Sequence, residues 1–385
     1  MRLECLARAV VVSTLALLCA CGDDEVGGEC EPAADDGADS ADGCRLSARY
    51  VSFEGGEPVQ VGWYDGDLET PCEFEVAADG LLRCLPDGAG YRQFFSSPDC
   101  EASSALVRVP VRYGLTPAFM LEADYNFCPL RTRIFRVGPE HDGPVYDGIG
   151  PGMCRKVEAS ADIVNYRLGE EVLPVELVSA EREARGDGRL QDYVLVAEDG
   201  ARQPAWQFRD TELGEDCVFG AAADGSYRCM PGDFRLGESD PGFGDKACSQ
   251  EVGRGESCSQ SMFGLRRDSR ACQERWTAYE LGESIDTSVV FVVDGEGECS
   301  GVQITPDEGE LPIVRSVAGE VEPAELVGVE PELRGEGRVR ARWAQLDGGR
   351  QVFLGWFDTV TDCPCQLDTI PGDAGGCPDP MPAAP

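Results

Sequence analysis

Apolar and polar positions alternate in short runs along most of the chain. From about residue 45, runs rich in Val, Tyr, Phe, Trp and Arg are interrupted about every 8–12 residues by Gly, Asp or Pro, a pattern typical of β-strands. Asp-Gly pairs at 79–80, 199–200, 224–225 and 347–348 suit tight hairpins, because glycine tolerates a positive φ. No long helical stripe is present, so we expect an all-β fold. The clearest candidate strands are 48–53, 59–64, 72–76, 81–85, 105–109, 132–137 and 163–168.

An internal repeat organises these runs. In three segments an aspartate precedes a cysteine by seven residues, and a second cysteine follows twelve residues later: Asp65/Cys72/Cys84, Asp210/Cys217/Cys229 and Asp358/Cys365/Cys377. Beyond this core, Cys100 aligns with Cys248, Cys128 with Cys272 and Cys154 with Cys299, and residues 169–176 resemble 309–314. The sequence predicts repeat units at 45–188 and 189–337 and a partial unit at 338–385.

The length of the repeat indicates an architecture. Units of about 145 residues divide into three pieces the size of a four-stranded propeller blade, and the partial unit adds one more. We therefore expect a seven-bladed β-propeller whose last blade packs against its first. The alternative is a row of small β domains, each stapled by disulfides.

The first 21 residues carry an export signal. Arg2 and Arg8 precede a short apolar run that ends Leu18-Cys19-Ala20-Cys21-Gly22. This ending resembles the lipobox of bacterial lipoproteins, in which the cysteine receives a diacylglycerol after the signal is removed. The resemblance implies cleavage of the signal peptide 1–20, lipidation of Cys21, and anchoring of the protein to the cell envelope, at the outer membrane or the cell surface. Residues 21–44 are acidic and poor in apolar side chains, as expected of a disordered tether.

Export from the cytoplasm determines how the cysteines are interpreted. Of 19 cysteines, Cys5, Cys19 and Cys21 belong to the signal or anchor, which leaves 16 in an exported chain and predicts disulfides. The candidates are Cys72, Cys84, Cys217, Cys229, Cys365, Cys377, Cys100, Cys128, Cys248 and Cys272. A two-residue hairpin loop would place Cys72 opposite Asp87, and an odd loop centred on Ala78 would place it opposite Cys84. Each full unit holds five aligned cysteines, so one bond per unit must leave the unit or use Cys44, Cys258 or Cys363.

Charge limits the possible partners. The formal net charge is −38, and removal of residues 1–20 removes two arginines and one glutamate, which leaves −39. A surface of this charge repels nucleic acid and anionic lipid, so we expect neither as a partner. The membrane is reached through the lipid anchor alone.

Residues suited to catalysis are scarce. His141 is the only histidine, no serine lies in a Gly-x-Ser-x-Gly elbow, and we predict no metal site and no cofactor. The recurring Trp63-Tyr64-Asp65 and Trp356-Phe357-Asp358 motifs could form an aromatic sugar platform, although recurrence favours a core aromatic followed by a strand-end turn. We therefore expect a non-enzymatic module that binds protein or glycan or serves the envelope structurally. The alternative is a secreted glycosidase that uses only carboxylates.

Overall fold

The computed structural model describes most of the chain after the expected tether. The described residues are 42–51, 58–90, 94–100, 105–110, 117–124, 127–150, 153–158, 160–236, 242–255, 258–268, 274–285, 289–293, 297–303, 313–346, 349–360 and 362–365. Strands are the main regular structure of these residues, with short 3₁₀ turns at η3 (Pro174–Glu176) and η4 (Pro323–Glu325) and no α-helix among them, which confirms the all-β class. Cys21, Cys272 and Cys377 lie outside the described residues, as does the side chain of Cys365.

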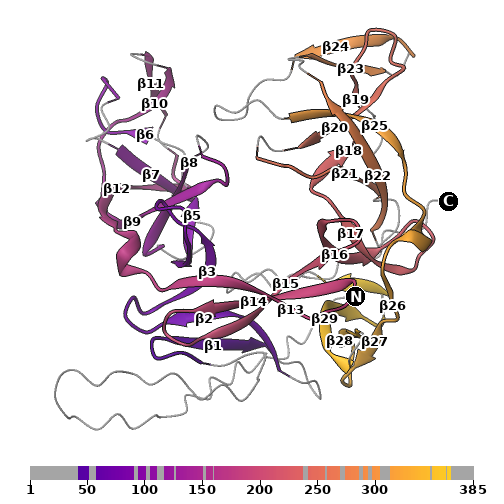
Figure 1. The fold of residues 1–385 in the computed structure, drawn as a ribbon. Coiled ribbons are helices and arrows are strands. Elements are labelled where there is room, and N and C mark those ends of the chain that lie inside the picture. Colours follow the sequence, from indigo (N-terminus) through magenta and orange to yellow (C-terminus); the bar gives the residue numbers. More distant parts are fainter. Residues whose placement is uncertain are drawn as a thin grey trace, which may run out of the picture.

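Three antiparallel meanders form a base (Figure 1). The first two share one ten-stranded sheet, and the third has its own four-stranded sheet. The first basal meander is β1 (Leu46–Val51), β2 (Val59–Asp65), β3 (Thr70–Val76) and β4 (Leu82–Pro86). The second is β13 (Ser179–Arg185), β14 (Leu190–Ala197), β15 (Arg202–Asp210), β16 (Glu215–Ala221) and β17 (Tyr227–Pro231), with β26 (Gly328–Val329) at the sheet edge. The third is β27 (Glu332–Arg334), β28 (Val339–Gln345), β29 (Gln351–Asp358) and β30 (Cys363–Cys365).

Two arms rise from the same side of the base (Figure 1). Each is an eight-stranded sheet inserted between consecutive basal meanders. Arm one comprises β5 (Gly88–Gly90), β6 (Phe94–Phe95), β7 (Ala105–Pro110), β8 (Phe119–Asp124), β9 (Arg131–Glu140), β10 (Val145–Gly150), β11 (Met153–Val157) and β12 (Ile163–Val172). Arm two repeats this order with β18 (Phe234–Leu236), β19 (Gly242–Phe243), β20 (Glu251–Gly255), β21 (Phe263–Asp268), β22 (Arg275–Ser284), β23 (Val289–Val293), β24 (Cys299–Gln303) and β25 (Ile313–Glu320). In arm two, β18 pairs with both β20 and β21 and closes a small five-stranded barrel.

Hydrophobic cores join the three basal meanders in a cycle. One core combines Leu46 and Trp63 of the first meander with Ala180 and neighbouring residues of the second. Another combines residues of the second and third meanders, and a third core places Val59 of the first meander against Ala341 and Trp356 of the third. The last meander therefore packs against the first as well as against the second.

The repeat motif marks one structural device in each meander. Asp65, Asp210 and Asp358 are the last residues of β2, β15 and β29 and are 0–1% exposed. Each forms an ion pair with the arginine just before the neighbouring strand, β1, β14 or β28, with N–O distances of 2.7 Å to Arg45, 2.8 Å to Arg189 and 2.6 Å to Arg338. The same carboxylates accept backbone N–H groups of the following turn. The recurring aspartate is therefore explained by a paired, hydrogen-bonded buried charge.

The seven-bladed propeller is wrong. A propeller keeps each blade as a separate sheet around a channel, whereas here strands of the first two units continue one ten-stranded sheet. The alternative, a row of separate disulfide-stapled domains, does not fit either, because the units share a sheet and hydrophobic cores. The expected similarity of 169–176 to 309–314 is wrong as well, since η3 and η4 show that Pro174–Glu176 corresponds to Pro323–Glu325.

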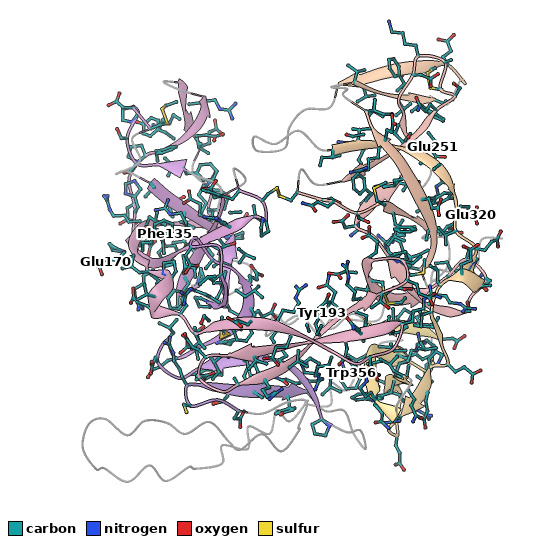
Figure 2. All side chains as sticks on the ribbon, viewed as in Figure 1. Phe135, Glu170, Tyr193, Glu251, Glu320 and Trp356 are labelled. Carbon is teal, nitrogen blue, oxygen red and sulfur yellow. A yellow bond between two sulfur atoms is a disulfide. The ribbon has the colours of Figure 1, made fainter. Side chains whose placement is uncertain are left out.

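Cysteines in the described part of the chain form disulfides, as expected for an exported chain. Described bridges are Cys72–Cys84, Cys217–Cys229, Cys100–Cys154, Cys248–Cys299 and Cys128–Cys258, and Cys44 and Cys363 are also disulfide-bonded. The bridge between Cys128 and Cys258 links the two arms, as Figure 2 shows. One bond therefore leaves the unit and uses the extra cysteine Cys258.

Both hairpin registers considered from the sequence are wrong. The loop is centred on Asp79, so Cys72 lies opposite Pro86, and Cys84 lies opposite Phe74. The bridge is diagonal, with a Cα–Cα distance of 5.3 Å. Strand twist brings one diagonal pair of neighbours together, and the geometry of a disulfide is met without direct opposition.

Residues 42–44 belong to the fold rather than to the tether. The N–H of Ala48 donates to the Asp42 carboxylate, and the N–H of Cys44 donates to the Asp199 carbonyl at 3.0 Å. The expected tether thus ends in residues that are fastened to the first two meanders.

Candidate functional site

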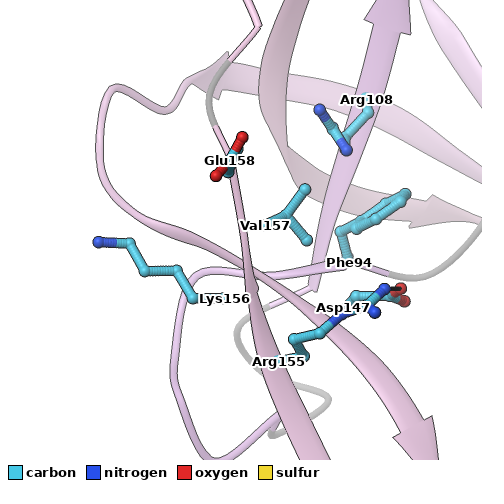
Figure 3. A pocket seen from close by; sticks show the side chains of 7 residues that line it. All are labelled: Phe94, Arg108, Asp147, Arg155, Lys156, Val157 and Glu158. Atoms are coloured by element: carbon cyan, nitrogen blue, oxygen red, sulfur yellow. Dashed lines mark hydrogen bonds and ion pairs between the residues drawn. The ribbon is translucent and has the colours of Figure 1, made fainter.

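A charged pocket lies near the outer end of arm one. It has a volume of about 440 Å³ and is lined by Phe94, Arg108, Asp147, Arg155, Lys156, Val157 and Glu158 (Figure 3). Strands β6, β7, β10 and β11 supply these residues, except Glu158, which directly follows β11. The hairpin β10–β11 is fixed to the arm by the pairing of β10 with β6 and by the Cys100–Cys154 bridge. Cys154 immediately precedes Arg155, so the disulfide also holds the start of the cationic segment.

The three cations in this pocket differ in how they are held. The Arg108 guanidinium lies over the Phe94 ring, 4.9 Å from its centroid, and its Nε is buried without a hydrogen-bond partner. Arg155 is exposed and reaches the buried Asp147 carboxylate at 3.5 Å. Lys156 extends from the rim, away from the Asp147 side of the pocket (Figure 3). Two carboxylates, Asp147 and Glu158, face three cations, which leaves the pocket with a positive formal charge in a chain whose net charge is −38.

Arm two provides an internal comparison for this site. Strand registers place Gly242, Val292, Ser300 and Gly301 where arm one has Phe94, Asp147, Arg155 and Lys156. Of the charged residues, Arg108 alone keeps its type, as Arg254. Arm two forms the same sheet without the other charges, so the fold does not need them. They are therefore candidates for a role in binding.

Sequence reasoning did not identify this pocket. The alignment of Cys154 with Cys299 was sufficient to show that Arg155-Lys156 corresponds to Ser300-Gly301. What the sequence could not show is that β6 and β7 bring Phe94 and Arg108 to the same place.

The aromatic motifs form no sugar platform. Trp63 is fully buried and its indole N–H donates to Gln203, while Trp356 is buried in the core between the first and third meanders. Trp63, Phe208 and Trp356 each lie opposite a cysteine, Cys72, Cys217 and Cys365 respectively. The motif is thus a core aromatic followed by a strand-end aspartate.

The remaining candidates for chemistry or membrane insertion are His141, metal-binding clusters and apolar helices. His141 lies near the end of β9, and its Nε2 is 3.2 Å from the Pro144 carbonyl oxygen. Within the ranges that the structure describes, no group of three His, Cys, Asp or Glu side chains is arranged to hold a metal ion. No helix in the same ranges is long and apolar enough to cross a membrane.

The fold and site define an all-β, disulfide-linked repeat protein with a three-meander base and two arms. The chain belongs to a family of unknown function, DUF7481, whose profile matches residues 35–259, more than half of the sequence. The matched segment contains arm one, its pocket and both cysteines of the bridge between the arms. No curated protein and no solved structure matches the chain.

Proposed function

We propose that this protein is a lipid-anchored envelope protein that binds, without catalysis, an acidic sugar of a glycan in the arm-one pocket. The observation that carries the proposal is the meeting of Arg108, Arg155 and Lys156 in one pocket of a strongly acidic protein. The disulfides agree with an extracytoplasmic location. The lipobox-like segment supports attachment through Cys21.

The charge distribution restricts the size and charge of the ligand. Guanidinium groups bind carboxylates through paired N–H donors, and the Phe94 ring offers an apolar surface beside them. The field of the whole chain repels an extended polyanion, but salt screens it beyond about 8 Å at physiological ionic strength. A glycan with one acidic sugar at the contact point satisfies both conditions better than a uniformly charged polymer.

Binding of D-glucuronate-terminated oligosaccharides, compared with neutral analogues, tests the proposal by calorimetry. The double variant Arg155→Ser/Lys156→Gly copies arm two, so it should fold normally and bind roughly tenfold or more weakly, because charged hydrogen bonds contribute about 1.5–3 kcal/mol each. Arg254→Ala, which changes the arm-two counterpart of Arg108, is the matched control and should bind like the wild type. Equal binding of acidic and neutral sugars, or unchanged affinity of the double variant, would refute the proposal.

A further inference from the structure

A second pocket lies in the base, between the second and third meanders. Its volume is about 450 Å³. Apolar and aromatic side chains form much of its wall, and Arg342 of β28 lies among them. The complete lining is Gly225, Ser226, Tyr227, Val329, Glu330, Pro331, Leu333, Arg342, Phe357 and Asp362.

Arg342 is a buried cation without a close anionic partner. The residue is 7% exposed, and its guanidinium carbon lies 4.1 Å from the centroid of the Phe357 ring and 4.8 Å from that of Tyr227. Among the described residues, none hydrogen-bonds to the guanidinium or pairs with it within salt-bridge distance. Burial lowers the pKa of Arg342 to about 10, while the more distant charge of Asp362 acts in the opposite direction. The guanidinium nitrogens are not among the fully buried unpaired atoms of the described residues, and Arg342 lines the pocket, so a ligand in the pocket can reach them. A partly desolvated guanidinium without a carboxylate favours an added acceptor.

The second meander has a carboxylate at the position where the third meander has none beside Arg342. There Asp216 lies opposite Arg209, accepts its guanidinium at 3.0 Å, and also accepts the hydroxyl of Tyr193 at 3.3 Å. Strand registers equate Tyr193 with Arg342 and Arg209 with Phe357, and they equate Asp216 with Pro364, which lies opposite Phe357. The third meander thus gains a buried arginine where the second has a tyrosine. It has Pro364 where the second meander has the carboxylate of Asp216.

We propose that the pocket at Arg342 binds the carboxylate of a small organic monoacid, in the place that Asp216 occupies in the second meander. A planar guanidinium donates two parallel N–H···O hydrogen bonds to a carboxylate. Val329, Pro331 and Leu333 then contact the apolar body of the ligand. Glu330 and Asp362 at the same pocket oppose a second negative charge, so phosphate and dicarboxylates are disfavoured. This site is separate from the arm-one pocket and does not depend on the function proposed above.

Benzoate and its neutral isostere benzamide are suitable probes, measured by calorimetry and by ligand-observed NMR on the full chain lacking only the signal and lipid. Benzoate should bind the wild type, and benzamide should bind roughly tenfold or more weakly, as expected for loss of a charge-assisted pair. Arg342→Met should weaken benzoate binding to a similar degree. Arg49→Met, at the same register position in the first meander, should leave it unchanged.

Pro364→Asp tests the same site without removing Arg342, and so still tests the proposal if Arg342→Met does not fold. This variant restores the carboxylate of the second meander, so it should block benzoate and raise the melting temperature by giving Arg342 an internal partner. Absence of benzoate binding to the wild type would overturn the inference. So would equal affinity for benzamide, or unchanged benzoate affinity in Pro364→Asp.

Discussion

Removal of the third basal meander should unfold the base, although this meander is the smallest part of the repeat. A chain that ends after Gly337 keeps only β27 of this meander and loses β28, β29 and β30. The lost segment contributes Ala344, Leu346 and Val352 to the core shared with the second meander, and Ala341 and Trp356 to the core shared with the first. Truncation therefore opens two cores at once.

The expected magnitude follows from the buried side chains. Leu346, Val352, Trp356 and Phe357 are all buried, and each contributes about 1.5–3 kcal/mol by leaving water. Their combined loss is roughly 6–12 kcal/mol, before the cost of exposing their partners Val59 and Leu190. This is comparable to the entire stability of a typical domain, about 5–15 kcal/mol. The truncated chain should therefore lose the cooperative unfolding transition of the base.

Calorimetry and limited proteolysis of the full and truncated chains measure this effect. Trp356→Ala in the full chain is a milder form of the same perturbation and should cost about 3–5 kcal/mol. Val360→Ala, at an exposed position of the same meander, should change stability by less than about 0.5 kcal/mol. A truncated chain that keeps its basal transition, or yields stable fragments of the first two units, would show that the meanders fold independently and refute the reasoning.

Three further predictions concern the anchor, the disulfides and acid stability. Cys21→Ser should abolish metabolic labelling with fatty acid and release the protein from the membrane, and unchanged labelling would contradict lipidation at this residue. Reduction should lower the melting temperature strongly, because closing the hairpin loops contributes roughly 3 kcal/mol each and the long Cys128–Cys258 loop nearer 5 kcal/mol in the chain-entropy model; alkylation of most of the 16 thiols without prior reduction would contradict this. The hydrogen bond from Arg133 lowers the pKa of Glu171 below its ordinary value of 4.5, so the carboxylate stabilises the fold above that value and this stabilisation is lost as the pH falls through the folded-state pKa. Glu171→Gln should therefore lower the melting temperature at pH 7 but not at strongly acid pH, with Glu170→Gln as control, and an equal difference at both pH values would rule out the ion pair as its cause.

The sequence alone determined the class of the protein and much of its strand pattern, because strand alternation and turn residues act locally. Seven of the expected strands lie within or across observed ones, and Gly80 and Gly225 adopt the positive φ that their hairpins require. The threefold recurrence of aromatic residue, aspartate and cysteine also followed from the sequence, since in each meander the aromatic residue lies opposite the cysteine and the strand ends at the aspartate.

Tertiary structure decided how the repeats combine and where binding chemistry gathers. Repeat length counts residues but does not tell which strands pair, so the same spacing fitted seven blades as well as three meanders with two inserted arms. The pairing of Cys128 with Cys258 depends on the two arms facing each other across 130 residues of sequence. The pocket of Arg108 and Arg155, and the isolation of Arg342 from any carboxylate like Asp216, likewise arise from contacts between distant strands. Sequence spacing does not encode such contacts, because they depend on how separate sheets fold back on one another.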